Sequence, residues 1–112
     1  NKHQREQAEK FGVEIYQMRN FEELSAMTFS NPVYCSIDID ALDPAYAPGV
    51  SHFEPGGLST RQLIDCINGF RGRLIGADIV EYNPERDFHN LTAMVAAKLL
   101  KEVIARIYHD NS

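Results

Sequence analysis

The sequence lacks several features that would assign it at once to a common class of protein. No apolar run approaches the roughly 20 residues of a transmembrane helix, and no signal-peptide pattern opens the chain. An excess of basic residues is also missing, because the net charge is −5, and this argues against a nucleic-acid surface. Internal repeats are absent, and no Gly-x-Gly-x-x-Gly motif follows a first strand, which counts against a nucleotide-binding domain.

Cysteine is scarce as well. Cys35 and Cys66 fall in predicted buried elements without metal-type spacing, so we interpret them as reduced packing residues in a reducing compartment. What the sequence does contain is a hydrophobic share of 44%, which is ordinary for a globular chain and argues against disorder. The 112 residues therefore predict one small domain or a piece of one.

Alternating strand and helix patterns predict an α/β fold. Strands are predicted at 13–18, 32–37 and 74–80, and helices at 3–10, 21–27, 60–70 and 91–108. Asn20, Ser59 and Asn90 have the chemistry of helix caps in front of the last three helices. Short connections in a β-α-β-α-β-α order predict parallel strands and right-handed crossovers.

Two carboxylates follow the predicted buried strand at 32–37. Side chains at i and i+2 of a strand share a face with their Cα atoms roughly 6.5–7 Å apart, so Asp38 and Asp40 are expected to point the same way. Carboxylates this close resist burial unless a positive charge lies between them, and one or two divalent cations are the simplest compensation. Taken alone, an Asp-x-Asp at a strand end also fits a solvated turn or a helix cap. Residues 41–57 form a long loop rich in Pro and Gly, and such loops are usually functional.

This stretch resembles the signature of the ureohydrolase family, which comprises arginases, agmatinases and formimidoylglutamases. The matching positions are Asp38-x-Asp40, Pro44, Pro48-Gly49 and Gly57, and the resemblance continues through residues 76–84 and 91–96. The sequence of residues 48–58 is most similar to that of plant-type arginases and their bacterial relatives. The resemblance implies an arginase-like, three-layer α-β-α fold with a mostly parallel sheet, of which residues 1–112 are expected to be the carboxyl-terminal part.

The resemblance also implies a metal centre. In this family two Mn²⁺ ions hold a bridging hydroxide that attacks the guanidinium carbon of the substrate, and by resemblance Asp38 bridges both ions while Asp40 ligates one. The other ligands of the family belong to a Gly-Gly-Asp-His and an Asp-Ala-His-x-Asp motif, and neither motif occurs in this sequence. At most half of a metal site is present, so we expect the isolated chain to be inactive.

Glu81 and His52 are the candidate substrate contacts. By resemblance Glu81, in the Glu-x-Asn-Pro stretch, orients the guanidinium group as a catalytic and substrate-binding residue. The alternative is a structural salt bridge from Glu81 to Arg86 or Arg73. His52 lies where relatives border the active-site mouth and either contacts substrate or is a solvated loop histidine. Asp78 is expected to support the metal shell or the sheet.

The function implied is hydrolysis of a guanidino compound to urea and an amine. L-arginine giving ornithine is the first choice, with agmatine giving putrescine and other guanidino acids as alternatives. A non-catalytic α/β binding module is the alternative of a different class. The resemblance implies a small cationic substrate and a homo-oligomer, trimeric or hexameric, and we expect neither nucleic acid nor membrane as a partner. A cytoplasmic location is expected, with an organelle matrix as the alternative.

Overall fold

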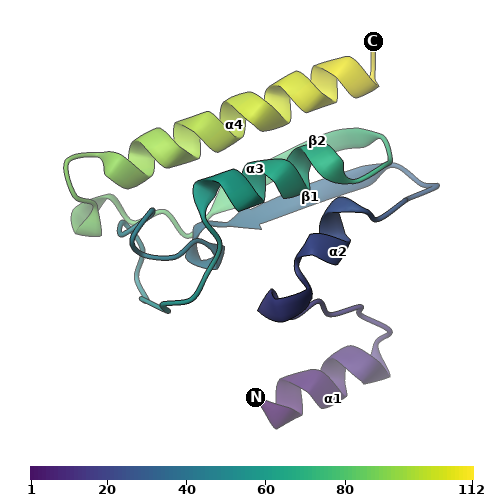
Figure 1. The fold of residues 1–112 in the computed structure, drawn as a ribbon, viewed down its shortest axis with the longest axis horizontal. Helices are drawn as coiled ribbons and strands as arrows, with labels where there is room; N and C mark the ends of the chain where they lie inside the picture. The colour runs from purple at the N-terminus through teal and green to yellow at the C-terminus, as the bar shows by residue number, and fades with distance from the viewer.

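A computed structural model describes residues 1–112. Its elements, in the order shown in Figure 1, are α1 (Lys2–Lys10), η1 (Met18–Asn20), α2 (Glu22–Ser25), β1 (Val33–Asp38), η2 (Ile39–Ala41), α3 (Thr60–Gly69), β2 (Leu74–Val80), η3 (Pro84–Arg86) and α4 (Leu91–Asp110). The four α-helices and the strands β1 and β2 thus confirm the predicted elements to within a few residues. The prediction that these strands are buried is wrong, because each has only one buried residue.

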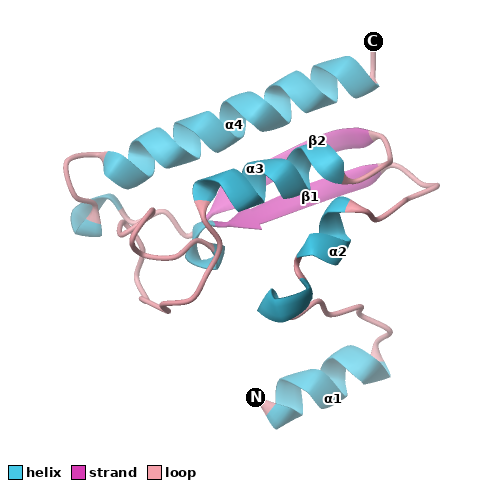
Figure 2. Cartoon of the chain, viewed as in Figure 1, coloured by secondary structure: helices cyan, strands magenta, loops and turns pink.

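The two strands form a parallel pair. Residues Tyr34–Asp38 of β1 lie in register with Gly76–Val80 of β2, with one irregularity after Val33. The connection between the strands runs through α3, which confirms the predicted parallel arrangement. Helices α3 and α4 lie over the same face of the pair (Figure 2), where α4 packs against β2 and α3 packs against α4.

The buried core lies between these helices and one face of the sheet. In β1 the side chains of Cys35 and Ile37 turn toward the core, while those of Tyr34, Ser36 and Asp38 stay exposed on the opposite face. The buried apolar side chains come from the strands, the long loop and both helices: Ile37, Ile39, Leu42, Ala47, Val50, Leu58, Ile64, Ile67, Leu74, Leu99 and Val103. The loop therefore contributes to the core as well as to the surface.

Both ends of α3 are held by side chains. The hydroxyl of Ser59 accepts from the backbone N–H of Gln62, and the Gln62 side chain accepts from the N–H of Ser59, so the predicted cap forms a complete capping box. At the other end the guanidinium of Arg106, from α4, donates to four backbone carbonyls, those of Ile67, Asn68, Phe70 and Gly72. One arginine thus satisfies carbonyl groups that the helix end leaves without partners.

The loop between η2 and α3 is closed by backbone and carboxylate contacts. Leu42 and Leu58 form an isolated parallel bridge, which brings the two ends of the loop together. Gly57 is required at this closure, because a Cβ there would lie 2.8 Å from the carbonyl oxygen of Ala41. Inside the loop the Asp43 carboxylate accepts from the N–H groups of Ala45 and Gly56, each at 2.8 Å. These bonds shape a segment that has no regular secondary structure.

The predicted strand at 13–18 is wrong. Residues 13–17 pair with no strand and run as irregular backbone into η1, with Val13 and Ile15 exposed. A strand is maintained by hydrogen bonds to a neighbouring strand, and nothing else in residues 1–112 offers one to this segment. The alternation of apolar and polar side chains alone does not provide these hydrogen bonds.

Two predicted caps are also wrong. Asn90 adopts a left-handed backbone with φ of 59° and its side chain makes no cap bond to α4. Asp87 takes that role, because its carboxylate accepts from the N–H groups of Thr92 and Ala93. Asn20 donates its amide to Glu23 and does not accept from α2, which begins without a side-chain cap.

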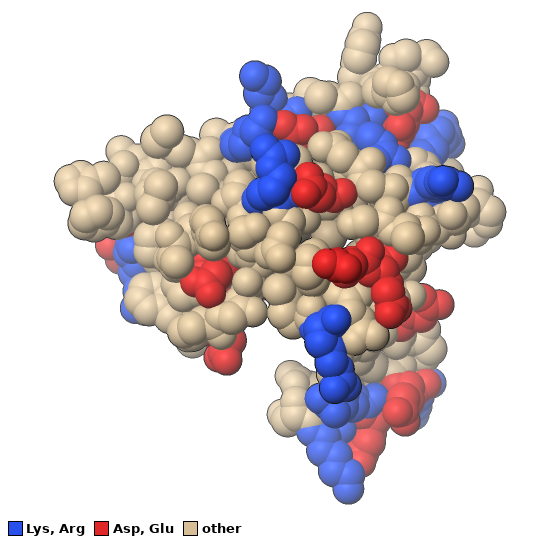
Figure 3. All heavy atoms as spheres, viewed as in Figure 1, with Lys and Arg blue, Asp and Glu red and all other residues tan.

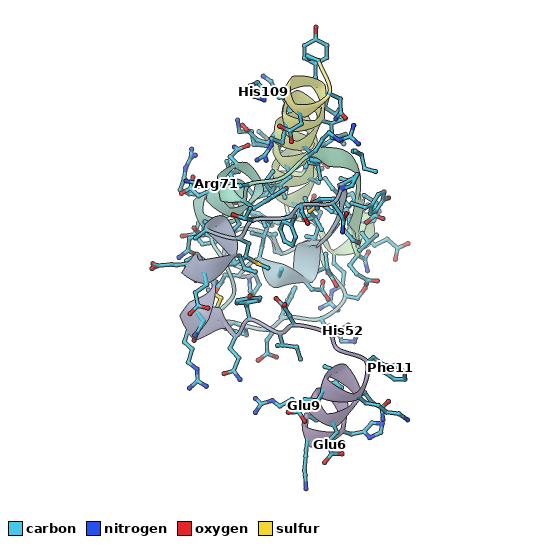
Figure 4. All side chains as sticks on the ribbon, turned by 90° about the vertical axis from the view of Figure 1, so that its right-hand side faces the viewer. Glu6, Glu9, Phe11, His52, Arg71 and His109 are labelled. Carbon is cyan, nitrogen blue, oxygen red and sulfur yellow. The ribbon has the colours of Figure 1, made fainter.

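The molecule is thin, with extents of 41 × 41 × 20 Å, and α1 projects from its body. Figure 4 shows α1, with the labelled Glu6 and Glu9, set apart from the sheet and its other helices. Acidic and basic side chains are interspersed over the face shown in Figure 3. None of the helices combines the length and apolar character that crossing a bilayer requires.

Candidate active site

The carboxyl ends of both strands lie at one edge of the sheet. Asp38, the last residue of β1, is in register with Val80, the last residue of β2, so Glu81 follows at the same edge. Figure 2 shows the long loop and the connection from β2 to α4 gathering at the arrowheads of the two strands. Open parallel sheets place their ligands at this edge. The structure therefore brings Asp38, Asp40 and Glu81 to the position where such a site is expected.

Asp38 and Asp40 are arranged by a turn. The strand ends at Asp38, and Asp40 lies in η2, so the strand geometry expected for the pair is wrong. The cause is local: the Asp38 carboxylate accepts from the N–H of Asp40 at 2.8 Å and starts the turn. Ile39 between them is fully buried, which anchors this turn in the core.

The donor chemistry of this pair fits a hard divalent cation. Asp40 is partly buried, and its Oδ1 atom is shielded from solvent without a hydrogen-bond partner. A buried carboxylate oxygen without a partner is costly, and a cation is the usual compensation. No group of three or more His, Cys, Asp or Glu side chains gathers in residues 1–112. Asp38 and Asp40 could therefore supply only part of a ligand set.

Glu81 has an unusual backbone. Its φ is 67°, in the left-handed region that residues with a Cβ adopt rarely and at a cost in free energy. The side chain is exposed and forms no ion pair. Arg86 and Arg73, the two alternatives for a salt bridge, bind the carbonyl of Ser51 and the side chain of Asn111 respectively. The Glu81 carboxylate is thus available for a cationic ligand.

The segment from Gly49 to Phe53 is attached to the residues after Glu81. The N–H of Asn83 donates to the carbonyl of Gly49 at 2.8 Å, and the Asn83 amide donates to the hydroxyl of Ser51. Arg86 adds a bond to the Ser51 carbonyl and lies 4.7 Å from the centre of the Phe53 ring. His52, between these two anchors, is exposed. The predicted loop histidine therefore lies on a segment that is fixed to the candidate site.

The Asp78 carboxylate is hydrogen-bonded to two side chains on the exposed face of the sheet. Its carboxylate accepts from the hydroxyl of Tyr34 at 3.0 Å and from that of Ser36 at 2.6 Å. The bond to Asp78 raises the pKa of the Tyr34 hydroxyl. This cross-strand arrangement supports the interpretation of Asp78 as a residue that supports the sheet.

Two features of the site were not predicted. Thr92, at the start of α4, is fully buried, and its hydroxyl accepts from the N–H of Gly49 at 2.7 Å. Asp87 accepts from the Tyr82 hydroxyl next to Glu81 as well as from the start of α4. The only signal in the sequence was an aspartate within the turn that precedes a helix, and Asn90 fitted the same signal.

His3, His109 and two surface hollows lie away from this edge. His52 and His109 lie well apart (Figure 4), and His3 lies on the projecting α1. One concave region is formed by residues 28–34, at the opposite end of β1, and another lies between α1 and residues 13–17. Neither is lined by a candidate residue.

Comparison with known proteins gives consistent results. The sequence matches the Arginase family over residues 1–105. It is 50% identical to arginase 2, chloroplastic/mitochondrial, of Arabidopsis thaliana, over 96% of this chain and 33% of the relative. It is 35% identical to an agmatinase of Bacillus cereus, over 88% of this chain and 36% of the relative.

Solved structures agree in fold. Arginase from Medicago truncatula superposes with a TM-score of 0.88 at 43% identity, over 96% of this chain and 36% of that one. A triple mutant of a T. brucei arginase-like protein, bound with Mn²⁺, gives a TM-score of 0.76 at 38% identity, over 83% of this chain and 34% of that one. The chain spans about a third of the length of the curated relatives it matches. The fold is arginase-like, and the chain belongs to the arginase family.

Proposed function

We propose that residues 1–112 form the carboxyl-terminal part of a ureohydrolase domain that hydrolyses a guanidino substrate to urea and an amine. The observation that carries this proposal is the buried, unpartnered Oδ1 of Asp40 next to Asp38 at the carboxyl edge of the sheet. A carboxylate oxygen in that state fits a metal ligand better than a solvated turn. A binding module that holds no metal would gain nothing from it.

Asp38 and Asp40 would hold manganese together with ligands outside residues 1–112. When bound, two Mn²⁺ ions would supply a hydroxide nucleophile at neutral pH. The Mn²⁺-bound structure of a T. brucei arginase-like protein mutant supports this choice of metal for the family. Oxygen-rich donor sets of this kind suit Mn²⁺.

Glu81 would bind the substrate guanidinium as a bidentate partner, because the carboxylate is unpaired and lies at the same edge as the aspartates. In this position it would orient the guanidinium carbon. His52 would contact the more distant part of the substrate from the segment anchored at Ser51 and Phe53.

L-arginine, giving ornithine, is the substrate we propose, because the plant relatives at about half identity are arginases. Agmatine and guanidino acids are the alternatives, since an agmatinase and a guanidinopropionase are more distant relatives. We also propose a homo-oligomer, trimeric or hexameric. A cytoplasmic location is our proposal, with an organelle matrix as the alternative because several relatives are named mitochondrial.

The test uses the full-length protein loaded with manganese. Urea release is measured with L-arginine, agmatine and 3-guanidinopropionate, and bound manganese is measured by elemental analysis. We expect the highest kcat/KM with L-arginine and two ions per subunit. A higher kcat/KM with agmatine would identify agmatine as the substrate in place of L-arginine. Release of no urea from any of the three compounds would refute the proposed reaction.

A further inference from the structure

Asp87 lies at the junction of three segments next to Glu81. Its carboxylate accepts four hydrogen bonds, which leaves neither oxygen free. The donors are the N–H groups of Phe88 (2.8 Å), Thr92 (2.9 Å) and Ala93 (3.0 Å) and the hydroxyl of Tyr82 (3.0 Å). One side chain thus ties the residue after Glu81 to the start of α4.

The backbone of Glu81 needs such support. Glutamate does not favour a φ of 67°, so the structure on both sides of Glu81 must impose this conformation. On one side, Val80 is fixed by its pairing with Asp38 in the sheet. On the other side, Tyr82 is fixed by its hydroxyl bond to Asp87.

A second set of contacts joins the same junction to the long loop. The carbonyl of Gly49 accepts from the N–H of Asn83, and the N–H of Gly49 donates to the buried hydroxyl of Thr92. A Cβ on Gly49 would lie 2.9 Å from Thr92 and 3.0 Å from Asp87, so the loop approaches α4 as closely as its backbone allows. The junction is therefore tightly packed as well as hydrogen-bonded.

The charge of Asp87 is permanent at neutral pH. Burial raises the pKa of this carboxyl, but hydrogen bonds from Thr92, Ala93 and Tyr82 outweigh burial and hold the pKa well below its usual range. A charged carboxylate at a helix N-terminus is also favoured by the helix dipole. The anchor for Tyr82 is thus strong and independent of pH in the neutral range.

We propose that Asp87 is a positioning residue for Glu81: by holding Tyr82 to the N-terminus of α4, it keeps Glu81 in the left-handed conformation that binds the guanidinium group. The inference rests on the proposed role of Glu81. Asp87 itself does not touch the substrate. Its effect passes through one hydroxyl group and one residue of backbone.

The most selective change is Tyr82→Phe in the full-length protein, because it deletes only the hydroxyl and leaves the bonds of Asp87 to α4. We expect kcat/KM for the guanidino substrate to fall by about 10- to 100-fold, since small misplacements of a binding group have effects of this size. The loss should appear mainly as a higher KM, with bound manganese unchanged. Asp87→Asn should produce a similar kinetic loss together with a lower melting temperature.

Tyr16→Phe is the matched control. It also deletes a hydroxyl that donates to a carboxylate, that of Glu14, in the exposed segment after α1. We expect wild-type kinetics from this variant.

A double-mutant cycle separates positioning from general packing. In a Glu81→Gln background, which removes the carboxylate that Tyr82 is supposed to position, Tyr82→Phe should lower kcat/KM by less than twofold. Losses that multiply in the double variant would overturn the positioning role while leaving the proposed function intact. A wild-type protein that releases no urea would overturn both.

Discussion

A single oxygen atom distinguishes Asp40 from the other acidic residues of the chain. Asp43, Asp78 and Asp87 all have hydrogen-bond donors for their carboxylates, whereas Oδ1 of Asp40 is buried without one. Leaving such an atom unpaired costs on the order of 1–3 kcal/mol. A cation at this position would remove that cost, so metal binding should also stabilise the fold.

Asp38→Asn tests the metal assignment in the full-length protein. The amide keeps the shape of the side chain and one acceptor for the Asp40 N–H, but it removes the charge that a bridging ligand needs. We expect loss of bound manganese and of urea release together, measured by elemental analysis and a urea assay.

Ile39→Val is the control for Asp38→Asn, because it changes the fully buried neighbour without touching a carboxylate. It should cost about 0.5–1.5 kcal/mol of unfolding free energy and no metal. Near-normal metal content and rate in Asp38→Asn would show that this aspartate only shapes the turn.

Arg106 has a structural role that depends on its guanidinium group. Its side chain is 13% exposed, pairs with Asp110 at 2.7 Å and lies 4.5 Å from the centre of the Phe70 ring. Because lysine cannot reproduce a planar group with five donors, Arg106→Lys should lower the unfolding free energy by about 1.5–3 kcal/mol in chemical denaturation. Arg61→Lys, at a side chain 73% exposed in a surface pair with Asp65, should change it by less than about 0.5 kcal/mol. Equal effects from the two variants would contradict this assignment.

At the scale of elements, the long loop depends on Asp43. Hydrogen bonds from the N–H groups of Ala45 and Gly56 lower the pKa of the Asp43 carboxyl. A carboxyl with a lowered folded-state pKa adds stability above its unfolded pKa of about 3.9, and this stability is lost as the pH falls through the folded value. Asp43→Asn should therefore destabilise the metal-free protein at pH 6, and the difference from wild type should shrink below about pH 4.

The measurement is urea denaturation of metal-free protein across this pH range. Asp65→Asn is the control, because Asp65 is an exposed carboxylate on α3 that orders no loop. A stability difference for Asp43→Asn that stays constant down to pH 2 would refute the titration argument.

The elements that the sequence predicted well are those with local causes. The apolar run at 74–80 and the Ser59 cap are short-range signals, and the structure has a strand and a capped helix at these positions. A strand at 13–18 would need a partner strand from elsewhere in the chain. The alternation of apolar and polar residues there therefore led to a wrong prediction. Asn90 and Asp87 had equally suitable side chains for capping α4, and only the folded path of the loop brings Asp87 to the exposed N–H groups.

At the candidate site, the sequence selects the residues, but only the structure gives their geometry. Asp38, Asp40 and Glu81 could be selected by pattern, and the parallel register places them at one edge. The turn at Asp40 was only an alternative to a shared strand face in the sequence. The positive φ of Glu81 could not be predicted, because glutamate does not favour this conformation.

At the scale of the whole molecule, residues 1–112 leave much of their apolar surface uncovered. The outer side of α4 exposes Met94, Leu100, Ile104 and Tyr108, and the two-stranded sheet has no helix over its Tyr34 face. Exposed patches of this kind mark contact surfaces. We expect the isolated chain to self-associate in light scattering.

The isolated chain is also expected to be inactive. With two candidate ligands and no cluster of three, it should show no stoichiometric manganese binding in calorimetry and no urea release. The full-length protein is the positive control for both measurements. Manganese-dependent urea release by residues 1–112 alone at an ordinary enzymatic rate would show that these residues contain the complete site.

The left-handed backbone of Glu81 sets stability and activity against each other. Glycine adopts positive φ without the clash that a Cβ introduces, so Glu81→Gly should relax the turn after β2 and raise the melting temperature of the protein. The same change would remove the carboxylate proposed to hold the guanidinium. A library of variants selected for heat resistance alone should therefore accumulate glycine or asparagine at position 81, and the selected proteins should be well folded but inactive. Selection for urea release should instead retain the strained glutamate.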